Sequence, residues 1–505
     1  MDKDIKGLAE TFNGSTELDK QMTFEYRYKT KPFDHQKDEL IVHGEKPRRA
    51  LFWEQGTGKT KPVIDTTVAA YDAGEVDALC VVAPNGVHRN WVSDELPAHM
   101  PEDVFDRTKC HIWYSTNTIK HKRSFNDMMK YTDGPKVFVI SYNALLTEGG
   151  NKAWRAFLKG NKCMYVLDES QRIKNPNGKW SRRITSSKDV AIMKRILSGT
   201  PCDNSPFDLY NQFRFIESRI WKDIDLPDFG VFKQFFGIWE TRRINERRKF
   251  EQCVAYRNLP LLHELMKTIG TRVTKDEVLD LPPKLYSKRH VELSPQQKRI
   301  YKRLKDDFIL ESAMEDIPVM LAIVRMLRFQ QIICGYLPSD EEGGKTELIP
   351  GKNPRLDALC EICEDLPHKA IIWARFTKDI ELISQHPVFA KRCTVVNGSV
   401  TGPKRGDALD SFQKGDVQFL IANPAAISTG VTLHSAKTVI YYSNTFKLGE
   451  RLQSEDRAHR IGLLHPVHYI DLVADGTIDE RIIDALRRKV NVSAVITGDT
   501  LKDWI

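Results

Sequence analysis

Two glycines precede a lysine and a threonine in the segment Trp53-Glu54-Gln55-Gly56-Thr57-Gly58-Lys59-Thr60. Glycines let backbone N–H groups converge on phosphate oxygens, while the lysine adds a positive charge at the start of the next helix. The hydroxyl of Thr60 can then ligate Mg²⁺. Trp53 stands where the full phosphate-loop pattern has its first glycine, so a chance surface loop is the alternative. The segment predicts a phosphate and Mg²⁺ site formed by Gly56, Thr57, Gly58, Lys59 and Thr60.

Two neighbouring carboxylates, Asp168 and Glu169, follow the apolar run Tyr165-Val166-Leu167. If that run is a strand, the pair lies at its carboxyl end, where ligands collect in open α/β sheets. Asp168 would then hold Mg²⁺, and Glu169 would accept a proton from an attacking water. An acidic turn that only caps a helix would look the same locally. Together with the lysine loop, however, the pair indicates a catalytic centre.

Two arginines, Arg457 and Arg460, lie three residues apart in the segment QSEDRAHRIG and therefore share one face of a helix. Guanidinium groups suit the charge that spreads over a transferring γ-phosphoryl group. A solvated, charged helix is the alternative interpretation. If these arginines reach a nucleotide bound near Lys59, hydrolysis requires a cleft between two distant parts of the chain to close.

Short apolar runs occur in two series along the chain. Continuous rather than alternating apolarity is typical of strands in a parallel sheet with helices on both faces, so two α/β sheets are expected. Between the series, residues from about 207 to 335 have apolar side chains at helical spacing and predict a helical middle. Pro282 and Pro283 would end a helix there and stiffen the crossing. The expected strands are 78–82, 137–140, 164–167 and 195–197, then 370–374, 394–396, 417–422, 439–442 and 469–473.

The composition restricts where the protein acts. Its 505 residues carry a formal net charge of +8, which suits a polyanionic partner without requiring one. No apolar run approaches the roughly 18 residues that cross a bilayer, and the N-terminus is charged, so neither a membrane span nor secretion is expected. The nine cysteines include one CxxC pair, Cys360 and Cys363, without a second pair, so no zinc is expected. We expect a cytoplasmic or nucleoid-associated, intracellular protein.

Six segments occur in an order that resembles the motif series of superfamily-two helicase-like ATPases, and more narrowly the Swi/Snf family of DNA translocases. RIKN after the acidic pair, LPPK followed by LSPQQKRIY, and DRAHRIG are more diagnostic of that family than the phosphate loop is. The resemblance covers about residues 32–481. The six segments are PFDHQ (32–36), GTGKT (56–60), VVAPNGVHRNW (81–91), DESQRIKN (168–175), LSGTP (197–201) and QSEDRAHRIG (453–462).

The resemblance implies an α/β protein with two RecA-like parallel-sheet lobes and helical insertions between and within them. We expect an N-terminal extension at 1–31, a first lobe with a C-terminal helical protrusion at 32–283 and a second lobe at 284–505. The second lobe would include a helical insertion at about 294–345 and a C-terminal brace at about 477–505. ATP and Mg²⁺ would bind between the lobes of a monomer, and DNA-dependent ATP hydrolysis would move it along double-stranded DNA.

The resemblance also assigns roles to single residues. Gln36 would contact adenine, Gly430 would belong to the nucleotide site, and Ser198 and Thr200 would link nucleotide state to DNA contact. Gln171 stands where the family usually has histidine, and its amide can donate and accept a hydrogen bond without titrating near neutral pH. Core packing is the alternative for aromatic side chains such as Tyr142 and Trp91. The candidate DNA contacts are Asn85, His88, Ser141, Tyr142, Asn143, Arg375, Asn397 and Thr432.

Other activities stay open at this point. A strand-separating, branch-migrating or annealing DNA helicase acting on forks and recombination intermediates would have the same motifs, and no stretch resembles a histone-tail reader. An RNA helicase is less well supported, because RIKN and LPPK do not belong to that group's pattern. A nucleic-acid-binding scaffold that binds nucleotide without turnover would have lost Lys59, Glu169 or the arginine pair, and all are present.

A basic cluster in the middle of the chain also has two interpretations. It could line a duplex groove, where each phosphate contact adds salt-sensitive affinity. It could equally be a solvated helix face, because Glu246 and Glu251 lie among its members. The cluster consists of Arg242, Arg243, Arg247, Arg248, Lys249 and Arg257.

Overall fold

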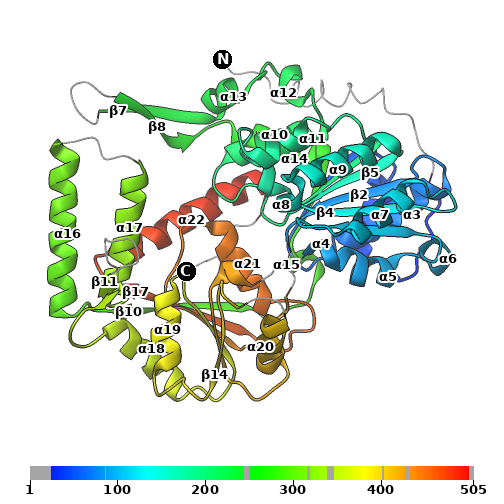
Figure 1. Ribbon diagram of the computed structural model, residues 1–505. Coiled ribbons are helices and arrows are strands. Elements are labelled where there is room, and N and C mark those ends of the chain that lie inside the picture. The colour runs from blue at the N-terminus through cyan, green and yellow to red at the C-terminus, as the bar shows by residue number, and fades with distance from the viewer. Residues whose placement is uncertain are drawn as a thin grey trace.

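The two series of apolar segments form two separate parallel β-sheets in the computed structural model (Figure 1). The structure describes residues 24–499 except 86, 244–248, 315–318, 338–345, 401–402 and 428–430. All nine predicted strands are confirmed, as is the α/β class with two parallel sheets. We call the part of the chain around the first sheet the first lobe, and the part around the second sheet the second lobe.

The first sheet has seven strands in the order β3-β4-β2-β5-β6-β1-β9, and each neighbouring pair is parallel. Alternate side chains of one strand enter different cores, since Cys80 packs in one cluster and Val81 in the other. Helices therefore cover both faces, as the continuous apolarity predicts. The strands are β1 (Arg48–Trp53), β2 (Ala78–Ala83), β3 (Lys109–Trp113), β4 (Lys136–Ser141), β5 (Cys163–Asp168), β6 (Met193–Leu197) and β9 (Gly270–Val273).

Helices of the first lobe connect these strands. They include one π-helical turn, η2, set between two short α-helices. The helices are α2 (Asp34–His43), α3 (Thr60–Asp72), α4 (Val87–Asn90), η2 (Trp91–Glu95), α5 (Leu96–His99), α6 (Glu102–Phe105), α7 (Ile119–Met129), α8 (Tyr142–Leu145), α9 (Glu148–Gly160), η3 (Ser170–Ile173), α10 (Lys179–Thr185), η4 (Pro206–Asp208), α11 (Leu209–Ile216), α12 (Ile220–Asp223), α13 (Phe229–Phe236), α14 (Leu259–Ile269) and α15 (Lys275–Val278).

The second sheet has six strands in the order β10-β17-β16-β13-β15-β14, again all parallel. Its strands also divide their side chains between two cores, because Ile372 packs in one and Ile371 in the other. The elements are β10 (Lys284–Val291), α16 (Pro295–Met314), α17 (Val319–Ile333), β11 (Tyr336–Leu337), β12 (Glu347–Leu348), α18 (Pro354–Glu364), β13 (Ala370–Trp373), α19 (Thr377–Gln385), β14 (Cys393–Val396), α20 (Pro403–Gln413), β15 (Phe419–Ala422), η5 (Pro424–Ala426), β16 (Thr438–Tyr441), α21 (Leu448–Ala458), β17 (Val467–Ala474) and α22 (Ile478–Thr497).

The predicted helical middle is confirmed only in part, because residues 207–335 contain strands as well as helices. An antiparallel hairpin, β7 (Gly237–Arg243) with β8 (Lys249–Tyr256), projects from the first lobe (Figure 1). Trp239 stacks on Phe207 with ring centroids 6.0 Å apart, and this tertiary contact holds the base of the hairpin. Arg242, Arg243 and Lys249 therefore lie on strands rather than on a helix face. Arg247 and Arg248 lie outside the described residues, and Arg257 follows β8.

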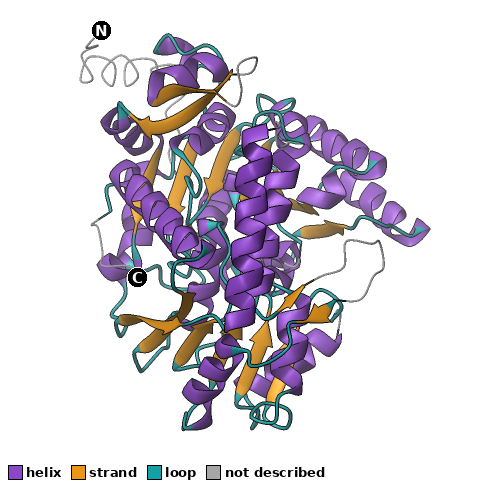
Figure 2. Ribbon diagram, turned by 90° about the vertical axis from the view of Figure 1, so that its left-hand side faces the viewer, coloured by secondary structure: helices purple, strands orange, loops and turns teal. Residues whose placement is uncertain are grey.

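Several elements of the second lobe lie close to the predicted boundary between the lobes or reach back over it in space. The strand β10 begins at Lys284, directly after the two prolines, and forms an edge of the second sheet. The helices α16 and α17 stand apart from the sheets on the side of the molecule that faces the viewer in Figure 2. At the other end of the second lobe, α22 crosses to the first lobe, where His263 Nδ1 lies 2.9 Å from the carbonyl oxygen of Ile496. The lobes are thus joined both by β10 and by the C-terminal helix.

Candidate nucleotide site between the lobes

The phosphate loop connects the end of β1 to the start of α3. Gly56 and Gly58 have φ angles of +85° and +80°, a region that other L-residues rarely adopt. Lys59 Nζ donates to the carbonyl oxygens of Trp53 and Glu54, at 2.9 and 3.0 Å. Burial lowers the pKa of this ammonium, while Glu169 and Asp168 oppose the shift. The loop therefore holds its lysine inside the turn, facing the two carboxylates.

The PFDHQ segment supports this loop from outside. Gln36 Nε2 donates to the carbonyl oxygen of Gly58 at 2.9 Å, and Gln36 Oε1 accepts from the backbone of Phe33. A Cβ atom on Gly58 would lie 2.3 Å from Gln36 Nε2, so a glycine is required there. His35 Nε2 lies 2.8 Å from the carbonyl oxygen of Thr57, a contact that was not predicted. Gln36 thus contacts the phosphate loop itself, and its contact with adenine stays a prediction.

The acidic pair lies at the carboxyl end of β5, as predicted. Burial and then the charge of Glu169 raise the pKa of Asp168 to about 6, and a hydrogen bond from Trp91 Nε1 at 3.0 Å opposes that rise. The two neighbouring carboxylates face a lysine and repel each other, and a divalent cation bound by their oxygens would remove that repulsion. Asp168, together with Thr60 at the start of α3, therefore fits Mg²⁺ bound beside a triphosphate. Among the described residues, no group of three or more His, Cys, Asp or Glu side chains forms a metal site.

Glu169 is held by two side-chain amides. Its φ of +53° is unusual for a residue other than glycine, and its carboxylate accepts from Gln55 Nε2 at 3.2 Å and from Gln171 Nε2 at 2.6 Å. Gln171 Oε1 in turn accepts from Ser198 Oγ at 2.8 Å, and Ser198 Oγ accepts from the backbone of Thr200 at 3.2 Å. A continuous hydrogen-bonded chain therefore connects the acidic pair to the LSGTP segment.

The second lobe brings Arg460 to the phosphate loop. A Cβ atom on Gly56 would lie 3.8 Å from Arg460 Nε, and Arg460 Nη1 donates to Thr432 Oγ1 at 3.0 Å. Arg457 is 5% exposed and donates to the carbonyl oxygen of Ile427 at 2.9 Å. Burial and the neighbouring Arg460 lower the pKa of Arg457 to about 10. The alternative of a solvated, charged helix is wrong, because Arg457 is buried. Arg460 is half-buried and follows the end of α21 at Ala458, so the two arginines do not share one helix face as predicted.

A buried lysine joins the lobes at the same place. The backbone N–H of Lys275 donates to Glu54 Oε2 of the phosphate loop at 2.8 Å. Its Nζ donates to Asp456 Oδ1 at 2.6 Å and to the carbonyl oxygen of His459 at 2.8 Å. Lys275 was not predicted to be a site residue, because it belongs to no phosphate-binding pattern. Its position shortly before the LPPK segment was the one signal available.

Two family models match the chain. The SNF2-related domain matches residues 43–334, which is more than half of the sequence. The chain belongs to the SNF2-related family. The helicase conserved C-terminal domain matches residues 354–462. The predicted resemblance to the Swi/Snf family is therefore confirmed.

Curated relatives align over most of this chain but extend well beyond it. The putative ATP-dependent helicase/translocase YwqA of Bacillus subtilis is 26% identical over 90% of this chain and 46% of its own length. The mouse DNA annealing helicase and endonuclease ZRANB3 is 26% identical over 94% of this chain and 41% of its own length. This SNF2-related chain thus spans less than half the length of these relatives. A solved Sulfolobus solfataricus SWI2/SNF2 ATPase core in complex with dsDNA is 21% identical, with a TM-score of 0.40, and covers 95% of this chain and 96% of its own.

The DNA-contact candidates of the first lobe fall into two groups. Asn85 and Asn143 are exposed at the carboxyl ends of β2 and β4. His88 is 5% exposed, and Ser141 Oγ accepts from the backbone of Ala144, which caps α8. Tyr142 is 1% exposed and donates from its hydroxyl to the carbonyl oxygen of Asp168. Tyr142 thus supports the backbone of the acidic pair and Ser141 caps α8, and the contacts of all these residues with DNA stay predictions.

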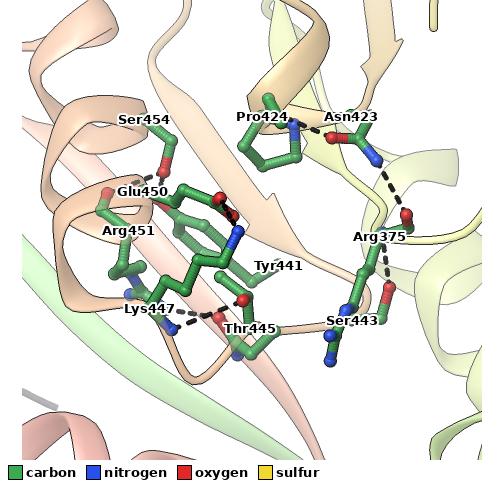
Figure 3. Close-up of a pocket in the computed structure, with 12 residues that line it drawn as sticks. Arg375, Asn423, Pro424, Tyr441, Ser443, Thr445, Lys447, Glu450, Arg451 and Ser454 are labelled. Atoms are coloured by element: carbon green, nitrogen blue, oxygen red, sulfur yellow. Dashed lines mark hydrogen bonds and ion pairs between the residues drawn. The ribbon is translucent and has the colours of Figure 1, made fainter. Parts of the chain in front are cut away.

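Of the second-lobe candidates, Arg375 lines a cavity of about 210 Å³ at the carboxyl ends of β13 and β16 (Figure 3), whereas Asn397 and Thr432 do not. Arg375 and Lys447 supply positive charge there, and Asn423 Nδ2 donates to the carbonyl oxygen of Arg375 at 2.7 Å. Asn397 is half-buried after β14, whereas Thr432 bonds Arg460 and so belongs to the nucleotide site. Gly430 lies outside the described residues. Within the described part of the chain, no helix is long and apolar enough to cross a membrane.

Proposed function

We propose that this chain is an ATP-driven motor that moves along double-stranded DNA. The observation that supports this most directly is the approach of Arg460 to Gly56, because the two residues belong to different lobes. A site completed by both lobes makes hydrolysis depend on their relative position, which is what a motor needs. Since one chain supplies both halves of the site, a monomer suffices.

Each site residue then has a distinct task. Lys59 and the backbone of Gly56, Thr57 and Gly58 bind the phosphates, and Mg²⁺ held by Thr60 and Asp168 would neutralise charge on them. Glu169, held by its two amide donors, accepts a proton from the attacking water. Arg460 supports the charge that develops on the γ-phosphoryl group, with Arg457 behind it.

DNA is proposed to lie against the carboxyl edges of both sheets. Asn85 and Asn143 offer polar groups on the first lobe, and Arg375 and Lys447 offer positive charge on the second. Such contacts reach phosphates and position the duplex without reading its sequence. A DNA substrate also implies an intracellular site of action.

Annealing or branch migration is the second candidate activity. It is favoured by the match of ZRANB3, named a DNA annealing helicase, over 94% of this chain. The projecting β7–β8 hairpin, with Phe250 45% exposed among basic side chains, offers a surface for unpaired strands.

One experiment separates these activities. ATP turnover is measured at one stated salt concentration with no nucleic acid, single-stranded DNA, duplex, fork, four-way junction and RNA, using Glu169→Gln as the inactive control. A translocase is stimulated most by duplex DNA, whereas a fork or junction optimum with ATP-driven strand products supports the annealing activity. Equal turnover with and without every DNA would refute both.

A further inference from the structure

The helix that follows β2 is interrupted by the π-helical turn η2. Leu96 donates its backbone N–H to the carbonyl oxygen of Trp91, five residues earlier. The next residue, Pro97, has no N–H to donate to Ser93, so the regular α-helical pattern cannot continue through this turn. Single π-turns within α-helices occur frequently at functional sites. The interruption therefore indicates that Trp91–Glu95 has a role other than forming a helix.

The turn directs the Trp91 side chain at the acidic pair. Trp91 is 1% exposed and packs with Val81 and Val166, while its Nε1 donates to Asp168 Oδ2 at 3.0 Å. An indole N–H is a donor only, so this bond favours the charged carboxylate and fixes its orientation. The Tyr142 hydroxyl donates to the backbone carbonyl oxygen of Asp168 at 2.9 Å and so holds the backbone of the same residue.

Glu95, at the other end of the turn, faces the cleft. Burial and the charge of Asp168 raise the pKa of Glu95 to about 7, and Arg460 of the second lobe opposes that rise. The π-turn is thus close to both the acidic pair and the arginine from the second lobe. A helix that only packs against the core would not need to lie near the acidic pair or near Arg460.

We propose that Trp91 is a positioning residue for Mg²⁺ at this site: its indole N–H fixes the carboxylate of Asp168 in the orientation that the cation requires. The proposal rests on the proposed nucleotide chemistry but not on DNA translocation. It predicts that the N–H group, rather than the aromatic ring, determines the affinity for Mg²⁺.

The test compares two tryptophans. Trp91→Phe retains an aromatic ring but removes the N–H, and Trp373→Phe is the matched control, since Trp373 is fully buried and its Nε1 has no hydrogen-bond partner among the described residues. Both changes are made in a Glu169→Gln background, and binding of ATP is titrated against Mg²⁺ without DNA. Trp91→Phe should raise the Mg²⁺ concentration at half-saturation about tenfold, the usual effect of removing an outer-shell hydrogen bond. Trp373→Phe should leave it unchanged.

Two results decide the proposal. An unchanged Mg²⁺ requirement in Trp91→Phe, or an equal rise in Trp373→Phe, overturns it. ATP binding in EDTA should be the same in the Glu169→Gln protein and in the two variants made from it. Its loss in Trp91→Phe alone would show a structural role and also overturn the proposal. This test contains no DNA, so it does not depend on the proposed motor. If duplex DNA fails to stimulate ATP turnover, that result contradicts only the motor and not the role of Trp91.

A second measurement uses the unmodified chain and so does not depend on how a variant folds. With ¹⁵N-labelled tryptophan, the indole N–H signal of Trp91 should shift when Mg²⁺ is added to the ADP complex. ADP with EDTA should not produce that shift. Trp91→Tyr, or Trp91→Phe, assigns the signal, and a Trp91 signal that ignores Mg²⁺ overturns the proposal.

Discussion

Gln171 Nε2 donates to Glu169 Oε2 at 2.6 Å, so the residue that replaces the usual histidine directly holds the carboxylate that we propose as the catalytic base. The same amide accepts from Ser198, which connects the acidic pair to the LSGTP segment. An amide does not titrate near neutral pH, so this connection keeps its hydrogen bonds where a histidine would change charge. Glutamine in place of the family's histidine therefore preserves the hydrogen-bonded link between the acidic pair and the LSGTP segment.

Gln171→Leu should reduce the stimulation of ATP turnover by DNA more than it reduces nucleotide binding. Leucine has a similar size but removes both hydrogen bonds, each worth about 1 kcal/mol or more when one partner is charged. DNA-stimulated turnover should fall about tenfold or more, with the affinity for ADP unchanged. Steady-state ATPase assays with duplex DNA and ADP titrations check this. A stimulated rate equal to that of the original chain would show that the connection is not used.

Glu169→Gln should bind ATP and fail to hydrolyse it. The amide cannot accept the proton of the attacking water, and loss of such a base costs about 10²–10⁴ in rate. Equilibrium binding of ATP and single-turnover hydrolysis are measured on the same preparation. Turnover at the original rate would remove Glu169 from its role as the base.

Lys275→Met should loosen the contact between the lobes. Its side chain is 3% exposed, and its ammonium donates to Asp456 and to the carbonyl oxygen of His459, so its loss leaves Asp456 with the more distant Lys284, whose Nζ lies 3.6 Å from Oδ1. Because Lys284 keeps part of the charge balance, the cost should fall below about 3–5 kcal/mol, the cost of a fully broken buried pair. Small-angle scattering should show a larger radius of gyration, and ATP should bind more weakly. Lys288→Met, exposed on β10, is the control, and identical scattering of the two variants would contradict the assigned contact.

His111 gives the first lobe a sensitivity to acid. Burial lowers its pKa to about 4, with a smaller effect of His121. The unfolded chain has a pKa near 6.5, so it takes up the proton first, and stability is full above about pH 6.5 and falls as the pH drops toward 4. The loss for this group approaches about 3 kcal/mol at the acid end.

His111→Phe should therefore reduce the acid sensitivity. His111 already stacks on Phe138, its Nε2 has no hydrogen-bond partner among the described residues, and its Nδ1 makes only a long contact of 3.4 Å with Ser124 Oγ, so a phenyl ring loses little there. Urea midpoints between pH 4 and 7 should vary less in this variant. His43 and His459 have pKa values lowered in the same direction, so the variation shrinks without vanishing. An equal reduction in His434→Gln, an exposed control, would contradict the assignment to His111.

The elements predicted correctly were those with strong local signals. Strands β2, β4 and β5 have continuous apolar stretches because they are covered on both faces, and the phosphate loop needs its glycines for backbone geometry. The strand β10 was missed because it is an edge strand with a polar sequence, and β1 because it begins with Arg48 and Arg49.

The contacts missed at the site are those between residues far apart in sequence. Lys275 reaches Asp456, and Arg272 joins Asp499 to the carbonyl oxygens of Phe52 and Gly199. Nothing local to Lys275 or Arg272 identifies these partners, which depend on how two lobes meet. The hairpin β7–β8 was missed for a related reason, because its base is fixed by Phe207.

The role of Arg460 tests the two-lobe motor most directly. Duplex-stimulated ATP turnover and ATP affinity are measured for the original chain, Arg460→Ala and the exposed control Arg487→Ala. Because an arginine of this kind acts on charge that develops during phosphoryl transfer, Arg460→Ala should lose about 10³-fold in stimulated rate while ATP affinity and Arg487→Ala stay unchanged. An undiminished stimulated rate in Arg460→Ala would contradict the account.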